Sequence, residues 1–210
     1  MLFGFIIFIY SIILHEIAHG LMAERLGDPT ARLSKRLSLN PISHIDPWMS
    51  ILFPLFLVLS GSPIIFGSAK PVPIDPYNLR NPKKDMGLIG MAGPASNLLI
   101  ALSLSLIARL VYSFLPYSTA IMDILRNAVL INIVLTIFNL IPLPPLDGGR
   151  VAIAFLPEKY SDALASIERF GMLIIIFLLF FPTRFFSLQG VVFKITGLLF
   201  SFIFPNFSLI

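Results

Sequence analysis

The stretch MLFGFIIFIYSIILHEIAHGLMAERLG, residues 1–27, is almost wholly apolar, yet it carries His15, Glu16 and His19 in its interior. The run is long enough for a bilayer-spanning helix, which needs about 20 apolar residues. Ionisable side chains inside such a helix are costly, and they usually face a functional interior. The stretch therefore predicts a membrane helix with a polar site on one face.

The composition extends this prediction to the whole chain. Of the 210 residues, 57% are hydrophobic and only 12% are charged, with a mean hydropathy of +0.91, whereas a soluble domain carries about 25% charged residues. We expect an all-α, polytopic integral membrane protein with one membrane-embedded domain, 1–210. The absence of cysteine excludes disulfides and thiolate metal sites. The net charge of +4 favours an anionic, cytoplasmic-side leaflet over nucleic acid as its partner.

Hydropathy predicts five to six transmembrane helices. Five apolar runs read as full spans, at 2–26, 87–115, 124–141, 164–182 and 189–205. A sixth run, 48–66, contains two prolines and a glycine, so it either spans or re-enters the membrane. The residues that follow it, up to 76, are rich in proline and β-branched side chains, and we expect a re-entrant or extended segment around 48–76.

The charges of the loops favour the re-entrant alternative. Lys and Arg occur in the loops 27–47 and 67–86, whereas the loop 116–123 has neither. Positively charged loops prefer the cytoplasmic side, and the first two loops share that side only if 48–66 does not cross. The N-terminus would then lie outside and the C-terminus inside.

The spacing of the three polar residues in the first helix indicates a metal site. Residues four apart lie on one helix face, so His15 and His19 can present two imidazoles to one ion, with Glu16 beside them. H-E-x-x-H on a helix is the arrangement of zinc proteases, in which the glutamate is the general base. Of the eleven acidic residues, Glu16 alone lies well inside a predicted span.

A catalytic zinc usually takes three protein ligands, and two residues compete for the third position. Asp147 lies in FNLIPLPPLDGGR (138–150), in which prolines end the preceding helix and two glycines follow the aspartate. Such a broken helix end is a common way to place a polar ligand in a membrane cavity. His44, between prolines in a loop, is the alternative ligand or a secondary site residue. Asp147 meets the histidines only if an odd number of spans separates them, which again requires that 48–66 does not cross.

These motifs resemble the site-2 protease family of intramembrane zinc metalloproteases. The family's H-E-x-x-H corresponds to residues 15–19, its N-x-x-P-x-x-x-x-D-G motif to residues 139–148, and its G-P-x-x-N motif to residues 93–97. The resemblance covers a motif-bearing core, about 1–150, and the C-terminal helices, 151–210, carry no matching motif. NPISHIDP (40–47) and FGSAKPVPIDP (66–76) resemble compact bacterial and archaeal members, so we expect a compact member without PDZ or CBS domains.

The resemblance implies one Zn²⁺ per chain, held by His15, His19 and Asp147, with Glu16 activating water. It implies cleavage of a membrane-protein substrate within or near its transmembrane segment, in regulated intramembrane proteolysis, usually after another protease has cut first. Asn139 and Pro142 match the family motif and are expected to bind substrate or orient the site. It further implies a bacterial or archaeal cell membrane, with the active site toward the cytoplasm.

Two interpretations stay open for the remaining polar features. Asn97 can hold substrate backbone or orient the site through its amide, or it can form a hydrogen bond between helices. The segment 62–76 can pair with an unwound substrate as an added strand, or it can be a plain connecting loop.

The main alternative function is a divalent-metal transporter or channel, in which His15 and His19 line the path. No second copy of the histidine helix is found in the sequence, and transport gives no reason for Glu16 between two ligands. An inactive relative that only holds membrane partners is a third alternative, which the intact Glu16 disfavours. The patterns leave self-association into a homo-oligomer open.

Overall fold

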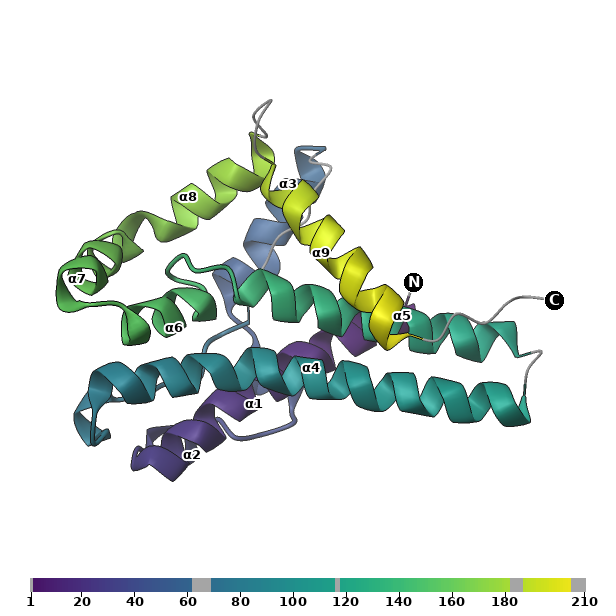
Figure 1. Cartoon of the computed structure of the whole chain (residues 1–210), viewed down its shortest axis with the longest axis horizontal. Helices are drawn as coiled ribbons and strands as arrows, with labels where there is room; N and C mark the ends of the chain where they lie inside the picture. The colour runs from purple at the N-terminus through teal and green to yellow at the C-terminus, as the bar shows by residue number, and fades with distance from the viewer. Residues whose placement is uncertain (1, 62–68, 116–117, 182–186, 205–210) are drawn as a thin grey trace.

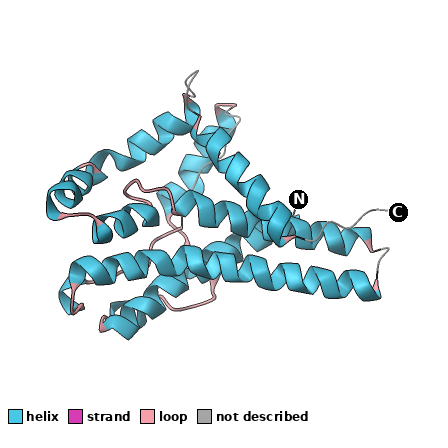
Figure 2. Ribbon diagram, in the orientation of Figure 1, coloured by secondary structure: helices cyan, strands magenta, loops and turns pink. Residues whose placement is uncertain are grey.

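The computed structural model describes residues 2–61, 69–115, 118–181 and 187–204, and within these ranges the chain is helical, with no strand (Figure 2). The longer helices are α1 (Leu2–Leu26), α4 (Pro82–Phe114), α5 (Thr119–Asn139), α8 (Glu168–Phe180) and α9 (Leu188–Ile203). The shorter ones are α2 (Thr30–Leu33), α3 (Phe53–Leu59), α6 (Asp147–Phe155) and α7 (Glu158–Ser166), with single turns η1 (Pro41–His44), η2 (Pro47–Leu52) and η3 (Pro76–Asn78).

Three helices form the frame of the molecule. α4 packs against both α1 and α5, and it runs in the opposite direction to them (Figure 1). The end of α1, the start of α4 and the short helix α6 consequently lie toward the same end of the molecule, and α6 packs against α4. Among the described residues, α4 is the one candidate span between the histidine helix and the helix that leads to Asp147.

The number of membrane spans is smaller than hydropathy predicts. In the described part of the chain, three helices are long and apolar enough to cross a membrane, α1, α4 and α5, and a fourth span results if α7 and α8 are counted together. The predicted span 164–182 is broken by a bend of 68° between α7 and α8. The predicted span 189–205 is a 16-residue helix, roughly 24 Å long, against a hydrocarbon core of about 30 Å. Five to six spans are therefore not confirmed.

The apolar run 48–66 does not form one long helix. Its described part consists of η2 and α3, which together span Pro47–Leu59, about 20 Å of helix. The described helical part is shorter than the hydrocarbon core of about 30 Å, and the non-crossing path stays a prediction from the charge pattern. The predicted extended segment lies partly in 62–68, outside the described residues, and its described part, 69–75, has no regular secondary structure.

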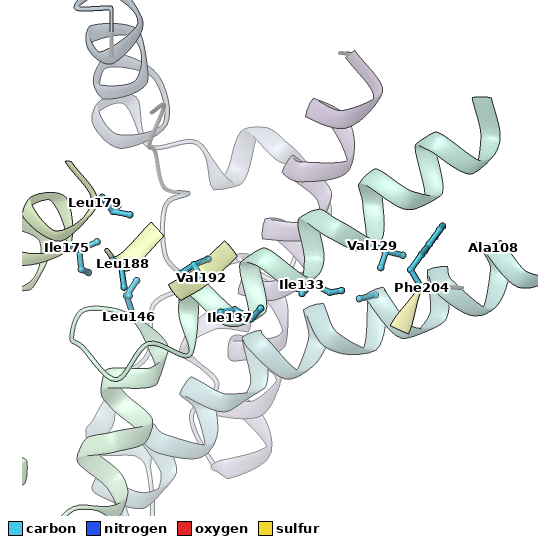
Figure 3. Close-up of a cluster of buried hydrophobic side chains, with 11 residues drawn as sticks. Ala108, Val129, Ile133, Ile137, Leu146, Ile175, Leu179, Leu188, Val192 and Phe204 are labelled. Atoms are coloured by element: carbon cyan, nitrogen blue, oxygen red, sulfur yellow. The ribbon is translucent and has the colours of Figure 1, made fainter. Parts of the chain in front are cut away.

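The apolar interior lies among α4, α5, α8 and α9. Figure 3 shows this cluster, to which Ile133 of α5, Ile175 of α8 and Val192 of α9 belong. Large apolar side chains also cover the outside of the helices, among them Phe5, Leu106 and Phe202, each more than half exposed. An outer surface of this kind suits lipid rather than water, so the chain is an integral membrane protein.

Candidate metal centre

The two histidines of the H-E-x-x-H motif lie on one face of α1, as their spacing predicts. The imidazole rings of His15 and His19 are 4.7 Å apart between centroids and stand edge to face. Both side chains are buried, with 6% and 4% of their surface exposed. Because α1 packs against α4 and α5, this face of the helix points into the protein and away from lipid.

Asp147 reaches the histidines because the chain breaks between α5 and α6. α5 ends at Asn139, and α6 begins at Asp147, so the carboxylate occupies the first turn of a helix, where the backbone N–H groups favour a negative charge. The two glycines that follow allow a tight connection. A Cβ at Gly148 would overlap the carbonyl oxygens of Leu140 and Ile141, and a Cβ at Gly149 would overlap the backbone of Pro144.

The three side chains form a set that fits zinc. Asp147 Oδ2 lies 3.0 Å from His15 Nε2 and 3.2 Å from His19 Nε2, and within the described residues these three form the group whose ligand atoms all lie within 4.8 Å of one another. Tetrahedral zinc with bonds of about 2.0–2.1 Å places neighbouring ligand atoms roughly 3.3 Å apart. Burial opposes ionisation of Asp147, but the adjacent His15 and His19 outweigh it and hold its pKa below the usual range.

The G-P-x-x-N segment of α4 packs directly against this site. A Cβ at Gly93 would overlap the Nε2 atoms of both histidines, so only glycine lets α4 approach this closely. Pro94 lies inside the helix and lacks an N–H, which loosens the preceding turn. In that turn the carbonyl oxygen of Ile89 accepts a hydrogen bond from His19 Nδ1 at 2.6 Å.

Asn97 belongs to a buried network of amides. Its Oδ1 lies 2.8 Å from His15 Nδ1, and its Nδ2 donates to Asn132 Oδ1 at 3.2 Å. Asn132 Nδ2 in turn donates to Ser11 Oγ and to the carbonyl oxygen of Ala128, both at 2.9 Å. Sequence analysis missed Asn132 and Ser11, although a polar amide in the middle of the largely apolar span 124–141 was a signal that could have indicated Asn132.

Glu16 faces a cavity that the three buried side chains of the His-His-Asp group also line. The cavity has a volume of about 750 Å³, within the range of small-molecule and peptide sites, and its lining is mostly apolar. Glu16 Oε2 accepts a hydrogen bond from the backbone N–H of Val72 at 2.9 Å. The segment 69–75 therefore forms one wall of the cavity, and residues from α1, α5, α6, α8 and α9 and from the loop before α6 form the rest.

The other residues singled out in the sequence lie in three different places. Asn139 lines the cavity, and its Nδ2 donates to the carbonyl oxygen of Leu135. Pro142 is exposed in the turn between α5 and α6 and is not part of the cavity wall. His44 is buried in η1, where its Nε2 lies 2.7 Å from the carbonyl oxygen of Ser38, and it does not join the group around Asp147.

A second polar cluster, which sequence analysis did not detect, holds the segment 69–75 in place. Asp28, fully buried just after α1, accepts hydrogen bonds from Thr30, from the backbone N–H of Asp75 at 2.8 Å and from Asn78 Nδ2 at 2.9 Å. Burial alone would raise the pKa of Asp28, but these donors stabilise the carboxylate and lower it. Arg36 holds the other end of the segment, donating to the carbonyl oxygen of Lys70 at 2.7 Å.

Comparison with known proteins places this site in a class. The sequence profile of "Peptidase family M50" matches residues 117–182. The chain is 34% identical to "Putative zinc metalloprotease YwhC" from Bacillus subtilis over 180 residues, which cover 83% of this chain and 78% of that protein. It is 28% identical to "Putative zinc metalloprotease Rip2" from Mycolicibacterium smegmatis over 172 residues, which cover 82% of this chain but only 64% of Rip2. No solved structure matches.

The helical membrane fold, the His-His-Asp group and these relatives together define a zinc metalloprotease embedded in the membrane. The chain belongs to peptidase family M50, and the resemblance to the site-2 protease family is confirmed. Zinc as the cofactor follows from the same relatives and from the donor set.

Proposed function

We propose that this zinc metalloprotease hydrolyses a peptide bond within or near a transmembrane segment of a membrane-protein substrate. The observation that carries the proposal is the position of Glu16, His15 and His19 on α1, a helix long and apolar enough to span the membrane. The cavity beside them is mostly apolar, and an apolar site at membrane depth favours an apolar substrate segment.

In this proposal the buried ligand set and the glutamate have separate roles. His15, His19 and Asp147 hold zinc, which when bound polarises the scissile carbonyl and makes water a better nucleophile. Glu16 is the general base. Its Oε2 is held by the N–H of Val72, whereas no described residue hydrogen-bonds its Oε1, which can take a proton from the attacking water. The same carboxyl then returns the proton to the leaving amine.

The segment 69–75 is the proposed support for an unwound substrate. A peptide bond inside a helix is covered by its own hydrogen bonds, so the substrate must extend locally before water can attack. In the described structure no residue hydrogen-bonds the carbonyl of Val72 or the N–H of Ile74, and both residues line the cavity. A neighbouring strand can form hydrogen bonds with the C=O of one residue and the N–H of the second residue after it. The C=O of Val72 and the N–H of Ile74 are such a pair.

Asn139, which lines the cavity from α5, is the proposed polar contact for the substrate. Its Nδ2 is bound to the carbonyl oxygen of Leu135, and within the described residues its Oδ1 has no partner, so this oxygen can accept from a substrate N–H. Pro142 has an orienting role, because it follows the end of α5 in the turn that leads to Asp147.

We further propose a cell-membrane location with the active site toward the cytoplasm. Arg32, Lys35 and Arg36 follow α1, and Lys83 and Lys84 open α4, which places these charges toward the end of the molecule at which α1 ends (Figure 1). Positive charge of this kind favours the cytoplasmic side. Regulated proteolysis, in which another protease trims the substrate first, is supported by the family resemblance.

The test reconstitutes the purified chain in bilayers with a single-span substrate. It compares wild type with Glu16→Gln, Asp147→Ala and the exposed control Glu158→Gln. We expect about one zinc per chain in wild type, in Glu16→Gln and in the control, and weakened zinc binding in Asp147→Ala. Cleavage should occur only in wild type and the control, and mass spectrometry should map the cut bond to the transmembrane segment.

Three results would contradict the proposal. They are cleavage that survives Glu16→Gln, full zinc in Asp147→Ala, and cleavage restricted to soluble peptides. A substrate pair with and without a bulky extramembrane domain tests regulation, since the trimmed form should be cut faster.

A further inference from the structure

We infer that Asn132, in α5, is a positioning residue that determines which nitrogen of His15 carries the proton and thereby aims the other nitrogen at the metal. The inference rests on the proposed role of His15 as a zinc ligand. It concerns a residue outside the H-E-x-x-H, G-P-x-x-N and N-x-x-P-x-x-x-x-D-G motifs, on a helix that contributes no ligand of its own.

The chain of hydrogen bonds begins at a backbone carbonyl, which can only accept. Asn132 faces the carbonyl oxygen of Ala128 at 2.9 Å, so the atom of its amide that lies there must be the NH₂ group. The second hydrogen of that group is donated to Ser11 Oγ at 2.9 Å. The orientation of the Asn132 amide is therefore determined, and its Oδ1 must point the other way, toward α4.

The same logic passes to Asn97 and then to His15. Asn132 Oδ1 is an acceptor, so the group that faces it at 3.2 Å is the NH₂ of Asn97. Asn97 Oδ1 consequently faces His15 Nδ1 at 2.8 Å, and that nitrogen must carry a hydrogen. Asn97 and Asn132 are both fully buried, so water does not compete for these bonds. A neutral His15 then keeps its lone pair on Nε2, the atom that faces Asp147.

His19 is held in the same Nδ1–H tautomer by a direct hydrogen bond to the backbone. Its Nδ1 lies 2.6 Å from the carbonyl oxygen of Ile89, a backbone acceptor that needs no further support. His15 has no backbone carbonyl at its Nδ1, and its partner Asn97 could turn its amide by 180° if nothing held it. Asn132 holds the Asn97 amide in one orientation, so a residue on α5 determines the tautomer of His15 on α1. Mutation of a side chain that hydrogen-bonds a metal ligand typically changes metal affinity by 10–100-fold, and Asn132 holds such a side chain, Asn97.

The first measurement is zinc affinity by competition with a chelator. Asn132→Leu, of similar size and without an amide, should bind zinc about 10–100-fold more weakly than wild type. Asn132→Ser is a second variant, since its hydroxyl can still bond the Ala128 carbonyl but is too short to reach Asn97. The matched control is Thr136→Val, one turn along α5. Thr136 donates to the carbonyl oxygens of Pro94 and Asn132 but takes no part in the chain to His15.

We expect Thr136→Val to change zinc affinity by less than about threefold. An equal loss in Thr136→Val would overturn the inference, because the effect would then come from any buried polar residue between α4 and α5. Unchanged affinity in both Asn132 variants would overturn it as well.

The second measurement reads the imidazole directly and needs neither metal nor activity. It uses ¹⁵N-histidine NMR of the metal-free Asp147→Asn chain, in which no carboxylate attracts a proton to Nε2. The chain has three histidines, and His19→Gln and His44→Gln assign the signals. In the Asp147→Asn chain, with or without Thr136→Val, we expect His15 in the Nδ1–H form. When Asn132→Leu or Asn132→Ser is added, the population of the Nε2–H form of His15 should increase.

An unchanged tautomer in the Asn132 variants would overturn the inference. Absence of zinc binding or of cleavage in the wild-type chain would instead overturn the proposed function. The NMR measurement of the His15 tautomer would still test the role of Asn132.

Discussion

Two parts of the interior are built on different chemistry. Between α1, α4 and α5, buried Ser11, His15, Asn97 and Asn132 are joined by hydrogen bonds. Among α4, α5, α8 and α9, the interior is aliphatic and aromatic (Figure 3). In a membrane, apolar side chains gain little by leaving lipid, so the apolar part is held by close packing. The polar part is held because each unpaired group in hydrocarbon would be costly, and this makes its geometry specific.

The largest effect on the polar part is expected from Gly93→Ala. The added methyl would overlap Nε2 of His15 and His19, which would separate α4 from α1 or displace the rings. Zinc affinity should fall by more than about 100-fold. This loss exceeds the 10–100-fold that follows from mutating a residue that only hydrogen-bonds a metal ligand. Chelator competition measures this loss. Gly197→Ala in α9, where a methyl meets nothing within 4 Å, is the control and should bind zinc normally. Normal zinc binding by Gly93→Ala would show that α4 does not confine the site.

The apolar part should respond in the opposite way, through stability and not through the metal. Ile175→Ala removes a fully buried side chain of α8 that does not line the cavity. The cavity left behind should lower the free energy of unfolding by about 2 kcal/mol, since the transfer component is small in lipid. Unfolding in mixed detergent micelles measures the change, and zinc affinity should stay within about threefold of wild type. A large loss of zinc would mean that the two parts are coupled.

A smaller, pH-dependent effect is expected from Asp28→Asn, which tests the cluster that holds the segment 69–75. The pKa of Asp28 is lowered in the folded chain, so its charge stabilises the fold above the usual carboxyl pKa of about 3.9. This contribution is lost as the pH falls through the lowered folded value.

Asp28→Asn should therefore cost about 1–2 kcal/mol near pH 7, and the difference from wild type should shrink in acid. Micelle unfolding at pH 7 and below pH 4 measures both values. The exposed acid variant Asp162→Asn is the control and should show no such trend. A constant difference at all pH values would mean that the Asp28 charge does not contribute.

Much of the site could be predicted from local patterns. The i, i+4 spacing of His15 and His19 places both rings on one face of a helix whatever the rest of the chain does. The prolines before Asp147 end α5 and the glycines after it allow a close turn. The membrane class follows from composition, because a chain with so few charged residues cannot cover a water-exposed surface.

The span count shows where local patterns reach their limit. Hydropathy detects apolar length, but it does not detect where a helix bends. The 68° break between α7 and α8 lies at Ile167, where no proline or glycine marks it. The charged pair Glu168 and Arg169 directly after the break was a local signal against one straight span over 164–182, but hydropathy averaged over the run does not register it. The same limit applies to the run 48–66, whose short described helices only the structure reveals.

The sequence by itself determined the class of protein, the metal chemistry and the placement of two candidate ligands on one helix face, because these depend on composition and on spacing within one helix. The tertiary structure decided that His44 lies apart and that Asp147 faces both imidazoles. It also decided that Val72 bonds Glu16 and that Asn132 reaches His15 through Asn97. These contacts join residues 35 to 132 positions apart, and only the packing of α1, α4, α5 and α6 brings such residues together.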